Sequence, residues 1–190
     1  MPDLLTAFGL SASAGLNAYI PLLTVALTAR FTNLIELTEP FDILTNGWVI
    51  GALVVLLVIE VLADKIPAVD HLNDVVGTVV RPIAGAVLFA AAAGNVFGFL
   101  DPRIAAIAGF MTAGVTHGAK ATARPMVTAT TAGVGNPVVS TLEDVAALLT
   151  SIVAILAPVL IGMALVLFVM LFVWWRARRR KATAQAGAGS

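Results

Sequence analysis

The sequence contains no cysteine and few charged residues. Without cysteine the chain cannot form disulfides, a thiol nucleophile or a cysteine-ligated metal site. Only 12% of the 190 residues are charged, whereas about 25% are charged in a soluble domain. Because 59% of the residues are hydrophobic and the mean hydropathy is +0.99, the composition predicts an integral membrane protein, with the lipid bilayer as its surroundings.

Basic residues are scarce outside the C-terminal tail. Five of the eleven lie between Arg176 and Lys181. The rest of the chain is net acidic, which excludes a nucleic-acid partner. The N-terminus, MPDLLTAFGL, has no positive region, so the first apolar segment is expected to remain in the mature protein. No GxSxG, P-loop or dinucleotide motif is present, so no enzyme activity and no cofactor is predicted.

The apolar runs predict an all-α fold, a polytopic transmembrane helix bundle forming one domain over residues 1–181. About five spans are expected, with a disordered tail after them. The expected spans are roughly 4–30, 47–63, 82–100, 103–123 (followed by a half-helix at 125–134) and 142–175, with the tail at 182–190. Proline disfavours helix at the preceding residue, and polar residues cap exposed backbone. Helix breaks are therefore expected at Asn17, Pro21, Pro125 and Asn136.

The end of the last span indicates its orientation. Trp174 and Trp175 are followed by RARRRK, which is an aromatic anchor and a positive flank. By the positive-inside rule the C-terminus is expected in the cytoplasm, in a multi-pass protein of the bacterial inner (plasma) membrane. Five spans would then place the N-terminus outside.

Two local similarities suggest an internal repeat. IPLLTVALTA from Ile20 matches RPMVTATTAG from Arg124, and SAGL from Ser13 matches TAGV from Thr112. The first and fourth spans would be equivalent, and since three spans, an odd number, lie from the first to just before the fourth, the two halves would have inverted topology, which recurs in secondary transporters. The alternative is chance, because Ala, Thr, Val and Leu dominate both segments.

Charge is concentrated in residues 60–85, EVLADKIPAVDHLNDVVGTVVRPIAG. On a helix, His71, Asp74, Thr78 and Arg81 would form one polar stripe, and His117, Lys120 and Arg124 would form a second. Stripes of complementary charge could face each other. The candidate residues for binding a substrate or a proton are Glu60, Asp64, Asp70, His71, Asp74, Arg81, His117, Lys120 and Arg124.

Each candidate also has a structural interpretation. Glu60 could carry a proton or a cation, or pair with Lys65 or Arg81. The basic residues could bind an anion, or be neutralised by nearby acids that include Glu143 and Asp144. The histidines could couple protons, but no HExxH spacing occurs and no metal site is predicted. Asn17 and Asn136 are expected to cap helices.

ADKIPAVDHLND and VVRPIAGA, with GLSASAGLNAYIPLL before them and THGAKATARP after them, form a recognisable pattern. The chain resembles a family of small bacterial membrane proteins described only as a domain of unknown function. The resemblance covers roughly residues 5 to 175 and implies a membrane location but no activity. From the residues, we expect a small permease or channel-like carrier of a small solute. The alternative is an accessory or scaffold subunit of a larger membrane complex. A homo-oligomer or contact with other membrane subunits is expected in either case.

Overall fold

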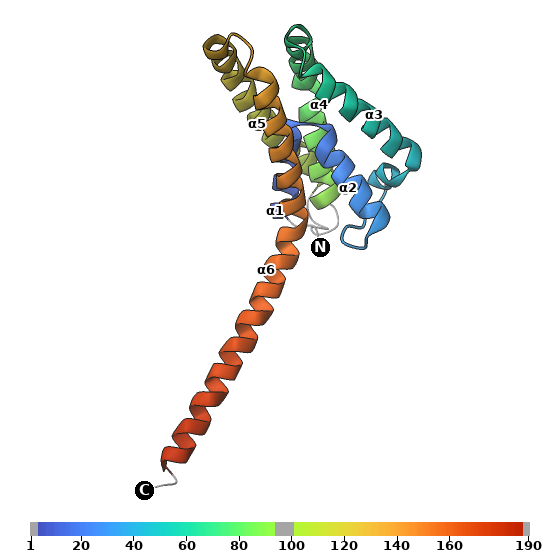
Figure 1. Cartoon of the computed structure of the whole chain (residues 1–190). Coiled ribbons are helices and arrows are strands. Elements are labelled where there is room, and N and C mark those ends of the chain that lie inside the picture. The colour runs from blue at the N-terminus through green and yellow to red at the C-terminus, as the bar shows by residue number, and fades with distance from the viewer. Residues whose placement is uncertain (1–3, 94–100, 188–190) are drawn as a thin grey trace.

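The structure is a computed structural model that describes residues 4–93 and 101–187. In these ranges all regular secondary structure is helical, without β-strands, as the sequence predicted. The elements are α1 (Leu4–Leu16), α2 (Tyr19–Phe31), the 3₁₀ helix η1 (Phe41–Thr45), α3 (Gly47–Ala63), α4 (Pro67–Ala93), α5 (Pro102–Thr131) and α6 (Asn136–Gly187). They form a bundle from which the C-terminal half of α6 extends away (Figure 1).

The apolar segment 4–30 contains two helices because the chain reverses between them. Asn17 lies at the break, and its Oδ1 accepts hydrogen bonds from the backbone N–H groups of Tyr19 (3.0 Å) and Ile20 (3.1 Å). This side chain caps the first turn of α2. Pro21 falls inside that turn, where its missing N–H costs nothing. Figure 1 shows α2 returning toward the end of the bundle at which α1 began.

α1 and α6 run antiparallel. Thr6 Oγ1 donates to the carbonyl of Ala154 (2.7 Å) and Ser13 Oγ to that of Ala147 (2.7 Å). Residue number therefore rises along α1 as it falls along α6. α5 and α6 are joined by the turn at residues 132–135 and are also antiparallel (Figure 1), so α1 and α5 run in the same direction.

This shared direction does not support an inverted repeat for SAGL and TAGV, whereas the other matching pair lies on α2 and α5, which run in opposite directions. SAGL lies on α1 and TAGV on α5, and helices related by inverted topology would run in opposite directions. The physical reason is the additional reversal at Asn17. The two motifs instead pack together, because a Cβ added to Gly15 would meet the Ala113 carbonyl oxygen at 2.5 Å.

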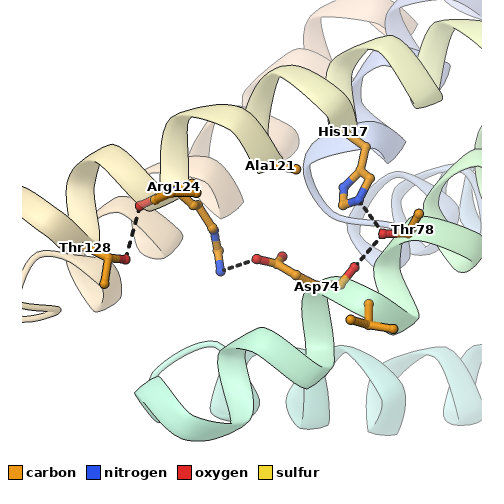
Figure 2. Close-up of a pocket in the computed structure, with 8 residues that line it drawn as sticks. Asp74, Thr78, His117, Ala121, Arg124 and Thr128 are labelled. Atoms are coloured by element: carbon orange, nitrogen blue, oxygen red, sulfur yellow. Dashed lines mark hydrogen bonds and ion pairs between the residues drawn. The ribbon is translucent and has the colours of Figure 1, made fainter.

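α4 and α5 form an antiparallel pair. Thr78 lies beside His117 and Asp74 beside Arg124, so residue numbers rise on one helix as they fall on the other (Figure 2). The six α-helices therefore alternate in direction (Figure 1). The start of α1 and the end of α6 therefore lie toward the same end of the bundle (Figure 1).

Helix boundaries differ from expectation around Pro125. A break was expected there, but α5 continues through Pro125 to Thr131. Proline removes one backbone hydrogen bond, which tertiary contacts can outweigh. The break lies instead at Ala132, which has φ 50 and a left-handed conformation. α6 begins at Asn136, earlier than expected, and is helical to Gly187, so most of the expected disordered tail is helix.

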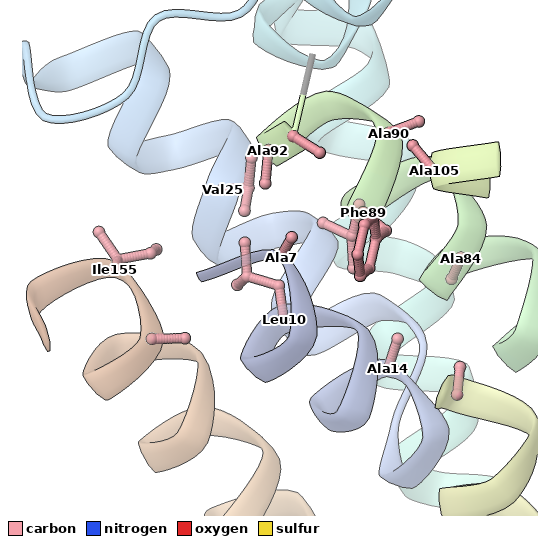
Figure 3. Close-up of a cluster of buried hydrophobic side chains, with 14 of the residues drawn as sticks. Ala7, Leu10, Ala14, Val25, Ala84, Phe89, Ala90, Ala92, Ala105 and Ile155 are labelled. Atoms are coloured by element: carbon pink, nitrogen blue, oxygen red, sulfur yellow. The ribbon is translucent and has the colours of Figure 1, made fainter. Parts of the chain in front are cut away.

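Small residues form most of the core around α1. Alanines of α1, α4 and α5 pack about Phe89 and Leu10 (Figure 3). Phe89 contacts Phe8 edge to face, with ring centroids 4.9 Å apart. Ser11 Oγ donates to the Gly85 carbonyl at 2.9 Å. Such surfaces let helix backbones approach closely, which is typical of helix packing in membranes.

Two helical segments are long and apolar enough to cross a membrane, Asn73–Ala93 and Asn136–Ala157. α1, α2 and α3 are shorter apolar helices. Large apolar side chains lie exposed on the outside of the bundle, including Val55, Val79 and Ile107. These features support association with a membrane.

Candidate functional site

The predicted polar stripes meet at one end of the bundle, where α3, α4, α5 and α6 converge. We call this cluster the charge network. Its members are joined by ion pairs and hydrogen bonds: Glu60, Asp64, Asp74, Arg81, His117, Lys120, Arg124 and Glu143. Arg81 is fully buried, and Glu60, Asp64, His117, Lys120 and Arg124 are each at least nine-tenths buried. Charges so buried need partners, because their desolvation is costly.

Arg124 joins three helices. Its guanidinium lies 3.2 Å from Asp64 Oδ2, 3.3 Å from Asp74 Oδ2 and 2.9 Å from Glu143 Oε2. Lys120 lies one helical turn away and pairs with the same Glu143 oxygen at 2.9 Å. These contacts connect the end of α3, α4 and the start of α6 to α5.

Lys120 also binds the end of α1. Its Nζ donates to the carbonyl of Leu16 at 3.0 Å. The last carbonyls of a helix have no intrahelical donor, and the reversal at Asn17 turns the chain away from this one. A cation at a helix C-terminus is also favoured by the helix dipole. The network therefore includes α1, which contributes no charged side chain.

Arg81 occupies the other half of the network. It donates to Glu60 Oε1 (3.0 Å), Asp74 Oδ1 (3.4 Å) and His117 Nδ1 (3.0 Å). Its guanidinium lies against Gly77, where an added Cβ would meet Cζ at 3.0 Å. A larger residue at position 77 would displace the guanidinium.

The contacts of His117 fix its tautomer. Arginine can only donate, so His117 Nδ1 accepts the bond from Arg81 and carries no proton. Thr78 Oγ1 donates to the backbone carbonyl of Asp74 (2.9 Å) and so accepts from His117 Nε2 (3.1 Å) (Figure 2). We assign a neutral imidazole protonated on Nε2. A proton on Nδ1 would break the bond to Arg81.

Asp64 follows the last residue of α3 and accepts more bonds than Glu60. Asn73 and Ser140 donate to its two oxygens at 2.5 and 2.9 Å, in addition to Arg124. Burial acts to raise the pKa of this carboxyl. The hydrogen bond from Asn73 and the charges of Lys120 and Arg124 outweigh burial, so the pKa of Asp64 lies below its ordinary value.

A pocket of about 240 Å³ opens beside the network between α4 and α5. Its lining residues are Asp74, Val75, Thr78, His117, Ala121, Arg124, Pro125 and Thr128 (Figure 2). Pro82 and Pro125 lie inside α4 and α5 and have no N–H to bond the carbonyls of Thr78 and Ala121, four residues earlier. Both of these residues line the pocket, so each helix is weakened beside it.

The structure brings together most of the predicted residues. The side chains of Asp70 and His71 lie outside its described part, and Lys65 is exposed and pairs with the Val61 carbonyl at 3.3 Å. Asn136 accepts a hydrogen bond from Thr128 at 3.1 Å. No group of three or more metal-ligating side chains occurs among the described residues.

Three polar partners were not among the predicted site residues: Asn73, Ser140 and Glu143. Glu143 was considered only as a neutralising acid. Asn73 directly precedes Asp74 on the charged helix, and this position could have indicated that its side chain joins the cluster. Nothing in the local sequence indicates that Ser140 reaches Asp64, 76 positions away.

Comparison with known proteins supports the resemblance found in the sequence. No curated protein and no solved structure matches the chain. The family model described as Domain of unknown function (DUF4126) matches residues 4–178. The chain therefore belongs to this family.

Proposed function

We propose that this protein is a small permease or channel-like carrier that moves a small polar solute through the pocket between α4 and α5. The observation that carries the proposal is the pocket itself. It lies beside a buried charge network and is lined by Asp74, Thr78, His117 and Arg124. Ionisable groups inside a membrane bundle are costly and mark solute or proton pathways.

The proline positions support this function. Thr78 and Ala121 lose their helical donors where they line the pocket. Carriers use weakened or interrupted helices at their binding sites, because free backbone carbonyls can bind a solute and the helix can bend there. A purely structural ion-pair cluster has no need of these two prolines.

The proposed location is the bacterial plasma membrane, in which the protein is multi-pass. The basic tail after Trp175 favours a cytoplasmic C-terminus. Because the helices alternate in direction and are even in number, the N-terminus is then also cytoplasmic. The charge network and the turn at residues 132–135 face the opposite side.

A reswelling assay tests the function without knowledge of the natural solute. Proteoliposomes are shrunk by an osmotic step of urea, glycerol, glycine or potassium acetate, and light scattering follows reswelling as the solute enters. We expect at least one solute to enter faster than into protein-free vesicles. Asp74→Asn should slow its entry several-fold, whereas Glu39→Gln, at an exposed acid, should not. Entry at the protein-free rate for every solute contradicts the proposal.

One observation favours a second candidate, an accessory or scaffold subunit. Along the part of α6 that extends beyond the bundle (Figure 1), large apolar side chains are exposed: Leu160, Met163, Leu167, Met170 and Trp174. A helix of this kind could pack against another membrane subunit. Stoichiometric co-purification with a partner, together with no solute flux, would favour this role.

A further inference from the structure

We infer that the charge network binds one exchangeable proton at Glu60, and that this proton controls the attachment of α3 to the bundle. The inference rests on the proposed function, because it makes the carrier proton-coupled. Glu60 is 4% exposed, and its Oε2 has no hydrogen-bond partner among the described residues. A buried carboxylate oxygen without a donor is costly when ionised, and a proton removes its charge.

The charge balance of the network calls for one more positive charge. Its four carboxylates are Glu60, Asp64, Asp74 and Glu143, and its three basic partners are Arg81, Lys120 and Arg124. With His117 neutral, one negative charge remains in excess. A proton or a small cation would neutralise it, whereas an anion would not.

The hydrogen bonds identify which carboxylate takes the proton. Asp64 accepts from Asn73, Ser140 and Arg124. Glu143 pairs with two cations, and Asp74 also pairs with two. Glu60 has a single donor, Arg81. Protonating any of the other three would sacrifice more bonds, so Glu60 is the acceptor.

The groups facing Glu60 are consistent with proton binding. Arg81 on α4 and Lys120 on α5 act on it as positive charges, and Asp64 at the end of α3 acts as a negative one. Tyr19 on α2 lies within electrostatic range. α1 carries no titratable side chain, and α6 contributes Glu143 through its pairs with Lys120 and Arg124. No group of three metal ligands occurs among the described residues, which favours a proton over a metal ion.

The step is a proton transfer with simple balance. A hydronium ion of the solvent gives a proton to Glu60 Oε2: one O–H bond of the hydronium breaks and leaves water, an O–H bond forms on the carboxylate, and the carboxylate loses its charge. Arg81 keeps Asp74 and His117 as partners, so it remains compensated when Glu60 is neutral. The ion pair between α3 and α4 is then reduced to a neutral hydrogen bond.

The pair of Glu60 with Arg81 is one of two attachments at the end of α3. Within the helix, Leu53 and Glu60 are buried, and Leu53 packs with Ala26 and Leu44 near the start. Asp64, directly after the helix, is held by Arg124 and Ser140. Protonation of Glu60 therefore weakens one of these two attachments and leaves the end of α3 held by Asp64 alone, which gives a carrier a way to couple proton uptake to movement.

Infrared spectroscopy of the reconstituted protein tests the proton site directly. On acidification we expect a carboxylic-acid band to appear at a higher pH than that at which the exposed acids titrate. The band should shift when the four glutamates are isotopically labelled, but not when the aspartates are. This measurement uses the wild-type protein and does not depend on a variant that folds.

Variants then assign the band. It should disappear in Glu60→Gln and persist in Glu39→Gln, an exposed glutamate. A band that persists in folded Glu60→Gln, shifts with aspartate labelling, or titrates with the exposed acids would overturn the inference.

Because the chain has no cysteine, spin labels can measure the movement of α3. Cysteines replacing Val55 on α3 and Met111 on α5, both exposed, report the distance between these helices. We expect the distance distribution to broaden on acidification in wild type and to be broad at every pH in Glu60→Gln. A distribution that does not change with pH in wild type would overturn the coupling to α3.

The two proposals can fail separately. Suppose that solute entry is unaffected by pH and that no glutamate band appears above the pH at which the exposed acids titrate. The protein would then be a carrier without a proton site. A glutamate band with no solute entry would leave a proton-binding protein whose transport role is refuted.

Discussion

Asp64 is the residue on which donors from α4, α5 and α6 converge. Asn73, Arg124 and Ser140 bind its carboxylate, which is 2% exposed. An amide in its place removes one of the three acids that pair with the Arg124 guanidinium, and its NH2 group cannot accept the bond that one of the two neutral donors, Asn73 or Ser140, makes to the carboxylate. Losing one partner of a buried pair costs about 3–5 kcal/mol. Asp64→Asn, which keeps the shape, should therefore lower the free energy of unfolding by on the order of 3 kcal/mol.

The lowered pKa of Asp64 makes this stabilisation depend on pH. A carboxyl whose pKa is lower folded than unfolded stabilises the fold above its unfolded pKa, and the gain is lost as pH falls through the folded pKa. Thermal unfolding of the detergent-solubilised protein should therefore show a stability that falls below about pH 4, near the ordinary aspartate pKa. In Asp64→Asn the decrease in stability at low pH should be smaller than in wild type, and in Glu39→Gln it should be the same as in wild type. Equal pH profiles for wild type and Asp64→Asn would contradict the assignment.

Residue-level prediction succeeded where the signal was local. The spacing of Asp74, Thr78 and Arg81 indicated that they share one face of a helix. In the structure Thr78 and Arg81 bond to His117 of the facing helix α5, and Arg81 also pairs with Asp74. It could not identify Ser140 as a partner of Asp64, because only the folded chain brings them together. The long-range pairing of charges depends on the path of every helix between them.

At the scale of the element, α4 and α5 approach each other closely where Gly85 of α4 meets Gly109 of α5. A Cβ on Gly109 would meet the Gly85 carbonyl oxygen and Phe89 Cβ, the latter at 2.5 Å, whereas a Cβ on Gly118 of the same helix would meet nothing within 4 Å. The backbone of α4 cannot move aside as a side chain can by changing rotamer. The two helices can therefore cross this closely only because position 109 has no side chain.

This contrast gives a matched pair of substitutions. Gly109→Ala should destabilise the protein by about 1–3 kcal/mol through overpacking. Gly118→Ala should stabilise it by about 0.5–1 kcal/mol, because alanine loses less entropy in a helix. Thermal unfolding monitored by tryptophan fluorescence compares the two. If both alanines change stability equally, the close approach of α4 and α5 is not as described.

Hydropathy predicted the bounds of one helix, and the other described helices begin or end elsewhere than expected. α3 has the same bounds as the apolar run at residues 47–63. Proline was weighted as a breaker, yet α5 continues through Pro125 and α4 through Pro82, since tertiary packing outweighs one lost hydrogen bond. The reversal near Asn17 depends on capping and on the pairing of Leu16 with Lys120, which sequence alone does not reveal.

At the scale of the whole molecule, the even number of alternating helices sets which ends share a side. With a cytoplasmic C-terminus, cysteines replacing Asp3 and Gln185 should both react with a membrane-impermeant maleimide only after the cells are opened. A cysteine replacing Val134, which is 80% exposed in the α5–α6 turn, should react in intact cells whose outer membrane is permeable to the reagent. Reaction of the first two from opposite sides would contradict the six-helix path.

The charge network also has a consequence for the order in which the protein is made. Glu143 is its one carboxylate on α6, which is synthesised after the other described helices. The other three carboxylates lie on earlier segments, where they face three cations. A nascent chain that ends before α6 thus carries balanced charges in this cluster. The cluster alone is balanced in such a chain, and Glu143 adds its odd negative charge when α6 docks.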